Sequence, residues 1–397
     1  MDYTNLLPQQ EIDENGIVFD MGSLYDYLKK IPDTRKQQGK RYSLATLLVM
    51  MVLAKLGGED RPSGITEWVA ERAEQLTRMK ILTRDKPPCH MTYRRVLQEI
   101  VDAQEFDALI HQYHQSRLKE EQGLVLTMDG KTLRGTIPYG EIRGTHLLSI
   151  YVPSQGLVLV QAQVDRKENE IVVAPQVLRQ VNLSGTIVIG DAMHTQRETS
   201  RQIVESRGDY IWFVKDNQSR TRWAIEKLFV HEVCNLHQGA PLSKEMRRIS
   251  KVSKGHGRIE TRTIFVSTLL NDYLDWPYIA QVFRLERIRW HNRYKGKTRE
   301  IVYGLTSLSP DRASPVRLLQ VIRKYWGIEN GLHYRRDVTF HEDATRLTVG
   351  QAGRNMATLN NLVLGLCLCQ RLLNVAKARR YFCARPDKAL ELILAAI

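Results

Sequence analysis

The hydrophobic residues of the first 120 positions follow a helical pattern. The segment 44–54 is apolar nearly all round and lies between Ser43 and Gly57-Gly58, which predicts a buried helix. Two more helices are expected after Pro62-Ser63 and after Pro87-Pro88. Short helices with exposed arginines fit either a helix-turn-helix reader of DNA or a plain helical bundle, and the pattern does not separate the two.

From residue 123 onward the hydrophobic period becomes that of β-strands. The pattern predicts strands and helices in the order β-β-β-α-β-α-β, over residues 123–129, 146–152, 157–164, 171–181, 185–191, 197–206 and 210–215. Three antiparallel strands followed by βα crossovers describe an α/β, ribonuclease-H-like (RNase H-like) mixed sheet. In that fold the first and fourth strands lie side by side and run parallel.

Two acidic residues end these two strands. Asp129 ends the first strand and Asp191 ends the fourth, so we expect the two carboxylates to converge at one edge of the sheet. Like charges at close range raise each other's pKa, and a divalent cation relieves the repulsion. Hard oxygen ligands favour Mg²⁺ or Mn²⁺ over zinc. Two such ions, about 4 Å apart, would suit an in-line phosphodiester displacement.

A third carboxylate is expected from a later helix, which begins at Ser314-Pro315 and runs to about residue 330. Glu329 shares a face of this helix with His333 and Arg336. Spacing alone favours a structural salt bridge for Glu329, and it leaves three acidic rivals for the catalytic position: Asp337, Glu342 and Asp343.

The sequence between residues 216 and 313 is too long for a loop and is basic and β-prone. It predicts an inserted, mostly β subdomain. Arginines and lysines interleave there with Trp290, Tyr294 and Tyr303, which suits phosphate contact and base stacking. A solvated basic face remains the alternative.

Charge is the informative part of the composition. The 397 residues contain 58 Lys plus Arg and 44 Asp plus Glu, a net charge of +14, which predicts attraction to a polyanion such as nucleic acid. Hydrophobic residues at 43% and charged residues at 26% exclude collagen-like and wholly disordered chains. Five cysteines without a CxxC pair suggest neither a disulfide framework nor a zinc ribbon. With no signal peptide and no apolar run long enough for a bilayer, we expect a cytoplasmic, nucleoid-associated protein without a membrane partner.

Five sequence blocks then occur in a fixed order. They are MDGKTLRG at 128–135, GDAMHTQ at 190–196, VKDNQ at 214–218, HGRIETR at 256–262 and WGIENGLHY at 326–334. Together they closely resemble the H-repeat-associated group of bacterial insertion-sequence transposases, which belong to the DDE superfamily. The resemblance covers nearly the whole chain.

The resemblance implies a metal-dependent enzyme that cleaves DNA strands and transfers them. It places the catalytic, metal-binding triad on Asp129, Asp191 and Glu329, with two Mg²⁺ or Mn²⁺ ions, and it is what selects Glu329 over its rivals. Two features depart from related families: Tyr325 stands where a basic residue is common, and the stretch 334–338 is more basic than in this group.

The predicted organisation is a helical N-terminal domain over 1–120, for DNA binding or assembly, and an RNase H-like DDE catalytic domain over 121–397. The basic β-rich insertion at about 216–313 interrupts the second domain. The expected partner is double-stranded DNA, as element ends and target, bound by a homodimer when two ends are joined. The residues predicted to contact DNA are Lys131, Arg134, Lys215, Arg258, Arg262, Arg289, Arg293, Lys295, Arg323, Lys324, His333 and Arg336.

Two other functions fit the same sequence. One is a domesticated, catalytically silent DNA-binding protein, and the other is a metal-dependent DNA nuclease without strand transfer.

Overall fold

A computed structural model describes residues 9–38, 40–165, 169–238, 241–255, 257–291 and 296–396. The chain forms two compact units that are built from interleaved segments. Unit 1 contains Met1–Lys119, Gly130–Asp165 and Glu329–Ile397, and unit 2 contains Glu120–Asp129 and Arg166–Ile328. No helix in the described part of the chain combines the length and the apolarity that a bilayer crossing requires.

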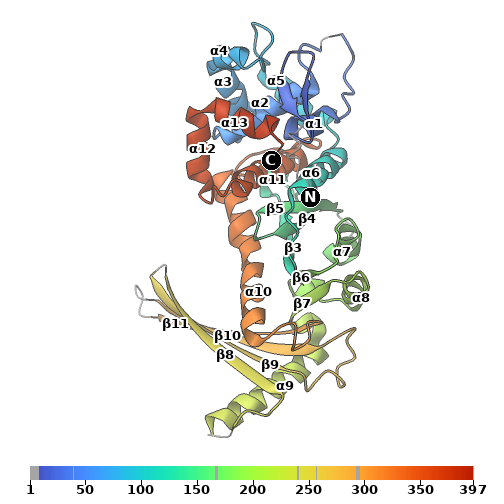
Figure 1. Cartoon of the computed structure of the whole chain (residues 1–397), viewed down its shortest axis with the longest axis vertical. Coiled ribbons are helices and arrows are strands. Elements are labelled where there is room, and N and C mark those ends of the chain that lie inside the picture. Colours follow the sequence, from blue (N-terminus) through green and yellow to red (C-terminus); the bar gives the residue numbers. More distant parts are fainter. Residues whose placement is uncertain are drawn as a thin grey trace, which may run out of the picture. The chain divides into compact units, whose positions relative to one another are not determined.

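Unit 1 is organised around helix α2 (Leu44–Leu56), whose thirteen residues are all buried. Ser43 caps this helix by accepting a hydrogen bond from the backbone N–H of Thr46, at 3.1 Å, and Gly57 ends it. This confirms the buried helix that the sequence predicts at 44–54. The helices that pack on α2 are α1 (Leu24–Lys29), α3 (Pro62–Glu71), α11 (Ala352–Cys369), α12 (Val375–Ala384) and α13 (Pro386–Leu394) (Figure 1).

The rest of the described part of unit 1 consists of helix α6 (Ala103–Arg117), two antiparallel strand pairs and several short helices and turns. Strands β4 (His146–Val152) and β5 (Leu157–Val164) pair antiparallel and have the predicted bounds. The remaining elements are β1 (Gln10–Ile12), β2 (Val18–Asp20), α4 (Ala73–Arg78), α5 (His90–Arg95), the 3₁₀ turn η2 (Arg134–Thr136) and the π-helical turns η1 (Val96–Ile100), η5 (Glu329–His333) and η6 (Arg335–Thr339).

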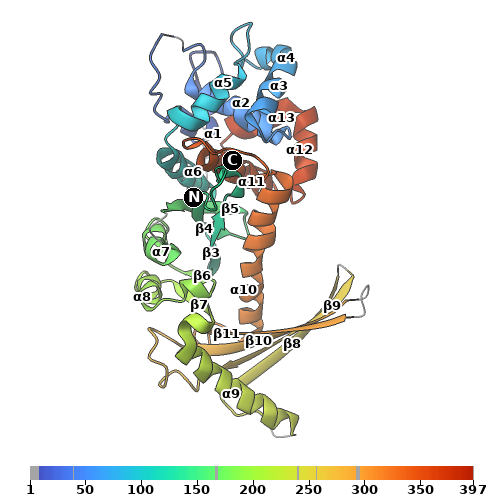
Figure 2. The ribbon, with the colours of Figure 1, turned by 180° about the vertical axis from the view of Figure 1, so that it is seen from behind.

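Unit 2 contains most of a large mixed sheet. Its hydrogen-bonded strand order is β3 (Leu124–Thr132), β6 (Thr186–Gly190), β7 (Asp209–Val214), β11 (Gly296–Thr306), β10 (Gln281–His291), β9 (Arg258–Ser267) and β8 (Met246–Gly255). Strand β3 begins in unit 2, and its last three residues, next to β4, belong to unit 1. Strands β3, β6 and β7 pair in parallel. The neighbouring pairs β7–β11, β11–β10, β10–β9 and β9–β8 are all antiparallel. The long strands β8–β11 extend well past the short strands β6 and β7 (Figure 2).

The helices of unit 2 confirm most of the predicted pattern. They are α7 (Glu170–Leu178), α8 (Arg197–Glu205), α9 (Ser219–His237) and α10 (Pro315–Ile328), with 3₁₀ turns η3 (Ala192–His194) and η4 (Asp216–Gln218). The predicted order β-β-β-α-β-α-β is observed as β3, β4, β5, α7, β6, α8 and β7. The segment 216–313, expected to be mostly β, also contains the 19-residue helix α9.

Helix α10 closes the core on one face of the unit 2 sheet. Ser314 caps the helix, with its hydroxyl 3.4 Å from the backbone nitrogen of Arg317. The apolar side of α10 packs on alternate residues of the strands, so that Leu318 and Ile322 share one core with Val125, Ile187 and Ile189. The same face of the sheet therefore continues along β3 and β6 toward their carboxyl ends.

This core should tolerate truncation poorly. Ile189 is fully buried. Ile189→Ala leaves a cavity between the sheet and α10, and we expect it to lower the free energy of unfolding by about 2–5 kcal/mol, measured from urea denaturation. The matched control Ile142→Ala, at a residue that is 88% exposed, should change it by less than about 0.5 kcal/mol. Equal losses in the two variants would contradict this assignment of the core.

Candidate active site

The parallel pair β3–β6 brings two acidic residues together within unit 2. The last residues paired in register are Met128 and Gly190, and Asp129 and Asp191 are the next residue of each strand segment. Because neighbouring strands lie about 4.8 Å apart, the two residues are adjacent across the sheet. Both are half-buried. The predicted side-by-side, parallel arrangement of these strands is confirmed.

The turn that carries Asp191 is tightly built. The Oδ1 atom of Asp191 accepts a hydrogen bond from the backbone N–H of Met193, at 2.9 Å, so the residue caps η3. His194, at the end of η3, is fully buried and its Nε2 lies 3.0 Å from Oε2 of Glu170 on α7. The turn is thus held both by its own cap and by the first residue of α7.

The VKDNQ block supports the same turn from the next strand. The side-chain amide of Asn217 donates to the carbonyl of Ala192, and that of Gln218 donates to the carbonyl of Thr195, at 3.0 Å. Sequence reasoning assigned these two residues no role, although the block itself was a signal. Their function in the structure is to fix the backbone on either side of η3, and with it the position of Asp191.

A cavity of about 320 Å³ lies beside Asp191 in unit 2. Lys215 and Arg222 bring positive charge to its wall, and Tyr325 and Trp326 line it from the last turn of α10. The guanidinium of Arg287 lies over the ring of Trp326, 4.7 Å from its centroid. Asp216 and Glu300 also line the cavity, and Asp216 pairs with Arg222, so the wall combines cationic, acidic and aromatic groups, of which the aromatic rings suit base stacking.

Glu329 directly follows α10 and is exposed. It is the first residue of the π-helical turn η5, and such turns are frequent at functional sites. Glu329 belongs to unit 1, whereas Asp129 and Asp191 belong to unit 2. Its membership of a triad remains a prediction from the sequence.

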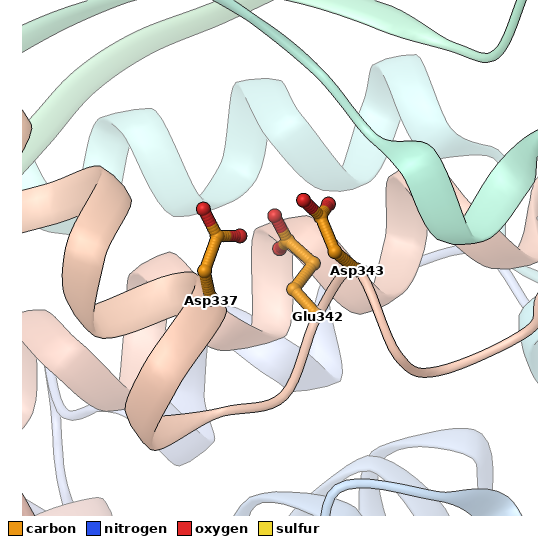
Figure 3. Close-up of side chains that lie close together, drawn as sticks. All are labelled: Asp337, Glu342 and Asp343. Carbon is orange, nitrogen blue, oxygen red and sulfur yellow. The ribbon is translucent and has the colours of Figure 1, made fainter.

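The three acidic rivals of Glu329 lie together in unit 1. Figure 3 shows Asp337 on a helical turn, Glu342 and Asp343 on the loop that follows, and their carboxylates pointing to the same side. One oxygen from each lies within 4.8 Å of the others, a spacing that could hold a metal ion. However, the ammonium of Lys131 lies 2.6 Å from Asp337 and 3.7 Å from Asp343. The ammonium group of Lys131 therefore supplies positive charge where a metal ion between these carboxylates would supply it.

A second cation completes this acidic cluster. Buried Arg336 donates from Nε to both oxygens of Glu342, at 3.0 and 2.9 Å. Burial would raise the pKa of Glu342, but the guanidinium of Arg336 and the ammonium of Lys131 hold that pKa below its usual value. Two cations thus offset most of the charge of the three carboxylates, and the cluster fits a structural role better than a metal site.

The structure divides the residues predicted to contact DNA. Five are buried or held in close ion pairs, which leaves their side chains poorly available to phosphates: Lys131, Arg262, Arg289, His333 and Arg336. Five are at least partly exposed: Arg134, Lys215, Arg258, Arg323 and Lys324. Arg293 and Lys295 lie outside the described residues.

Several known proteins have sequences similar to this chain, and two of the three described here align with more than nine-tenths of it. "Putative transposase YncI" of Escherichia coli O157:H7 is 28% identical over 377 residues, 94% of each chain. A second "Putative transposase YncI", of Escherichia coli (strain K12), is 30% identical over 253 residues, 64% of this chain and 98% of that protein. "H repeat-associated putative transposase YhhI" of Escherichia coli (strain K12) is 24% identical over 374 residues, 93% of this chain and 96% of that protein.

One solved structure, of a piggyBac transposase synaptic complex with hairpin DNA, has a TM-score of 0.45 and 11% identity, over 91% of this chain and 74% of that one. This structural similarity is too low to support a family assignment. Two family models match directly: "DDE_Tnp_1-associated" at residues 25–114 and "Transposase DDE domain" at residues 120–366. Since the second match spans well over half of the chain, the protein belongs to the DDE transposase family, as the five sequence blocks predict.

Proposed function

We propose that this protein is an insertion-sequence transposase that cuts DNA at the ends of its element and joins the freed 3′-hydroxyl to target DNA. Asp129, Asp191 and Glu329 are the proposed catalytic, metal-binding acids. The observation that carries the proposal is the register of β3 and β6, which makes Asp129 and Asp191 neighbours at one edge of the sheet. The transposase names of the relatives agree with it.

The catalytic fold is proposed to be RNase H-like. The order of elements from β3 to β7 and the parallel pairing of β3, β6 and β7 support this assignment. Ligands in open α/β sheets bind outside the carboxyl ends of parallel strands, which is where Asp129 and Asp191 are found.

Membership of the DDE transposase family implies dependence on a divalent metal ion. The residues fit this requirement, because Asp129 and Asp191 supply hard carboxylate oxygens at one edge of the sheet, and the backbone cap of η3 uses one of the two oxygens of Asp191. We propose Mg²⁺ or Mn²⁺, with two ions per site. Bound there, such ions would polarise the phosphodiester and stabilise the charge that develops on the attacking and leaving oxygens.

The assignment of Glu329 rests on the resemblance of its WGIENGLHY block to DDE transposases. Trp326 lines the cavity that also contains Asp191, and Glu329 follows three residues later on the same continuous helical segment. Its exposure leaves the carboxylate accessible to a metal ion, whereas its rivals are engaged with Lys131 and Arg336.

The proposed DNA contacts are the basic residues that are at least partly exposed: Arg134, Lys215, Arg258, Arg323 and Lys324. Lys215 is the best placed of these, since it lines the cavity beside Asp191. We further propose that a homodimer holds two element ends during strand transfer, because a single site acts on one end at a time.

The catalytic proposal is tested with Asp129→Asn and Glu329→Gln. On a plasmid that carries the inverted repeats flanking the coding region, each variant should lose metal-dependent cleavage by about a hundredfold or more, which corresponds to about 2.7 kcal/mol. Binding to labelled DNA without divalent ions should persist. The control Asp272→Asn, in an exposed loop between β9 and β10, should cleave normally.

Normal cleavage by both site variants would overturn the proposed mechanism. A pre-cut end with a free 3′-hydroxyl separates the remaining functions. Nicking without a strand-transfer product would indicate a metal-dependent nuclease, and binding without nicking or strand transfer would indicate a silent DNA-binding protein.

The omission of Lys131 from the DNA contacts gives a separate prediction. Because its side chain is only 10% exposed and is paired with Asp337, a double-mutant cycle of Lys131→Ala and Asp337→Ala should show a coupling energy of about 1–3 kcal/mol in unfolding. The i,i+4 pair Lys30–Asp26, at 3.1 Å and with the lysine side chain 54% exposed, should show only about 0.3–0.5 kcal/mol. A coupling near zero for Lys131, together with weaker DNA binding, would restore it as a DNA contact.

A further inference from the structure

Unit 1 contains a second cavity, away from the acidic residues discussed above. It has a volume of about 390 Å³ and is lined by three chain segments: 61–63 at the start of α3, 90–98 along α5 and η1, and the loop 344–349. These segments are up to nearly 290 positions apart in the sequence, so the cavity exists only in the folded unit.

The wall of this cavity carries one sign of charge. Arg61, Arg94 and Arg346 line it together with His90, and none of the described lining residues has a carboxylate. In the part of the chain that the structure describes, Arg61 and Arg94 form no ion pair with an acidic residue. By contrast Arg95, adjacent to Arg94, lies 3.7 Å from Glu99. Uncompensated guanidinium groups that converge on a cavity are suited to a bound oxyanion.

The backbone around the cavity holds its shape. Helix α3 begins at Pro62 without a side-chain cap, and the carboxylate of Glu59 lies close to Gly64 in its first turn. The backbone N–H of Leu347 donates to the carbonyl of Gly135 at 3.0 Å. A Cβ on Gly135 would come within 2.3 Å of the carbonyl oxygen of Thr345, so a glycine is required for this close approach.

We propose that this cavity binds a phosphate group of the DNA backbone. Arg61 and Arg94 are its principal ligands, with Arg346 and His90 as further donors. This inference rests on the proposed function, since it concerns where a transposase holds its DNA. The shared chemistry is a phosphate oxyanion, and duplex DNA is favoured as its source because Arg61 and Arg346 are exposed to solvent and the chain carries a net charge of +14.

The cavity also joins the two regions that match known families. Arg61, His90 and Arg94 lie in the DDE_Tnp_1-associated region, and Arg346 lies in the Transposase DDE domain region. A phosphate bound here would therefore be held by both regions at once. This gives the N-terminal helices a role as part of a composite DNA-binding surface, without a recognition helix in a groove.

The test is the double variant Arg61→Ala/Arg94→Ala in the full-length chain. Binding of a fluorescein-labelled duplex is followed by anisotropy over a series of KCl concentrations, without divalent ions. For the loss of one phosphate contact, we expect the slope of the logarithm of the association constant against log [KCl] to become less negative by about 0.9. We expect the Kd at low salt to rise by about tenfold. The matched control Arg95→Ala removes one exposed charge from the same segment and should leave the slope unchanged.

Circular dichroism and the thermal midpoint establish that the variants are folded. A folded double variant with the wild-type slope and Kd would overturn the proposal. The proposal would also be overturned if inorganic phosphate raised the thermal midpoint of the wild type but not of the double variant, while the double variant kept the wild-type affinity for DNA. The ligand of the cavity would then be a small phosphate compound. The two proposals fail separately: wild-type protein that binds DNA through Arg61 and Arg94 but never cleaves it would remove only the transposase mechanism.

Discussion

The parallel pairing of β3 with β6 is the constraint on which the candidate active site depends. Its register is fixed by the core, because Val125, Ile187 and Ile189 must all face α10. A slip of one residue would turn this apolar set to the opposite face of the sheet. Burial of hydrophobic side chains therefore forces Asp129 and Asp191 into neighbouring positions, even though two carboxylates so close together repel each other.

Much of this arrangement could be predicted because its signals are local. The strands at 146–152 and 157–164 alternate in the sequence and are separated by turn residues, and the structure reproduces both bounds. Helix α9 was not predicted, because its buried anchors Ile225 and Phe229 are set among charged residues in a region whose other segments are β-prone. The position of Asp191 was predicted from the strand end, but its support by Asn217 depends on a contact between turns that no local pattern encodes.

Which basic residues are available to DNA could not be predicted for the same reason. Lys131 stands two positions after Asp129 and looks like a phosphate ligand in the sequence, yet it pairs with Asp337, 206 positions away. Arg336 shares a helical face with Glu329 by spacing, but it is buried against Glu342. Composition counts such residues as free charges, whereas the fold uses them to neutralise the acidic cluster.

The basic hairpins show how far this internal use of charge extends. Burial would raise the pKa of Glu260, but hydrogen bonding and charge from Arg287, with further charge from Arg262 and Arg289, hold it below its usual value. A single buried acid thus engages three of the arginines that give the insertion its basic character. Attraction to DNA then depends less on the number of arginines than on where acidic partners are missing. By that criterion Arg61 and Arg94 are better candidates for phosphate contact than the strand arginines that pair with Glu260.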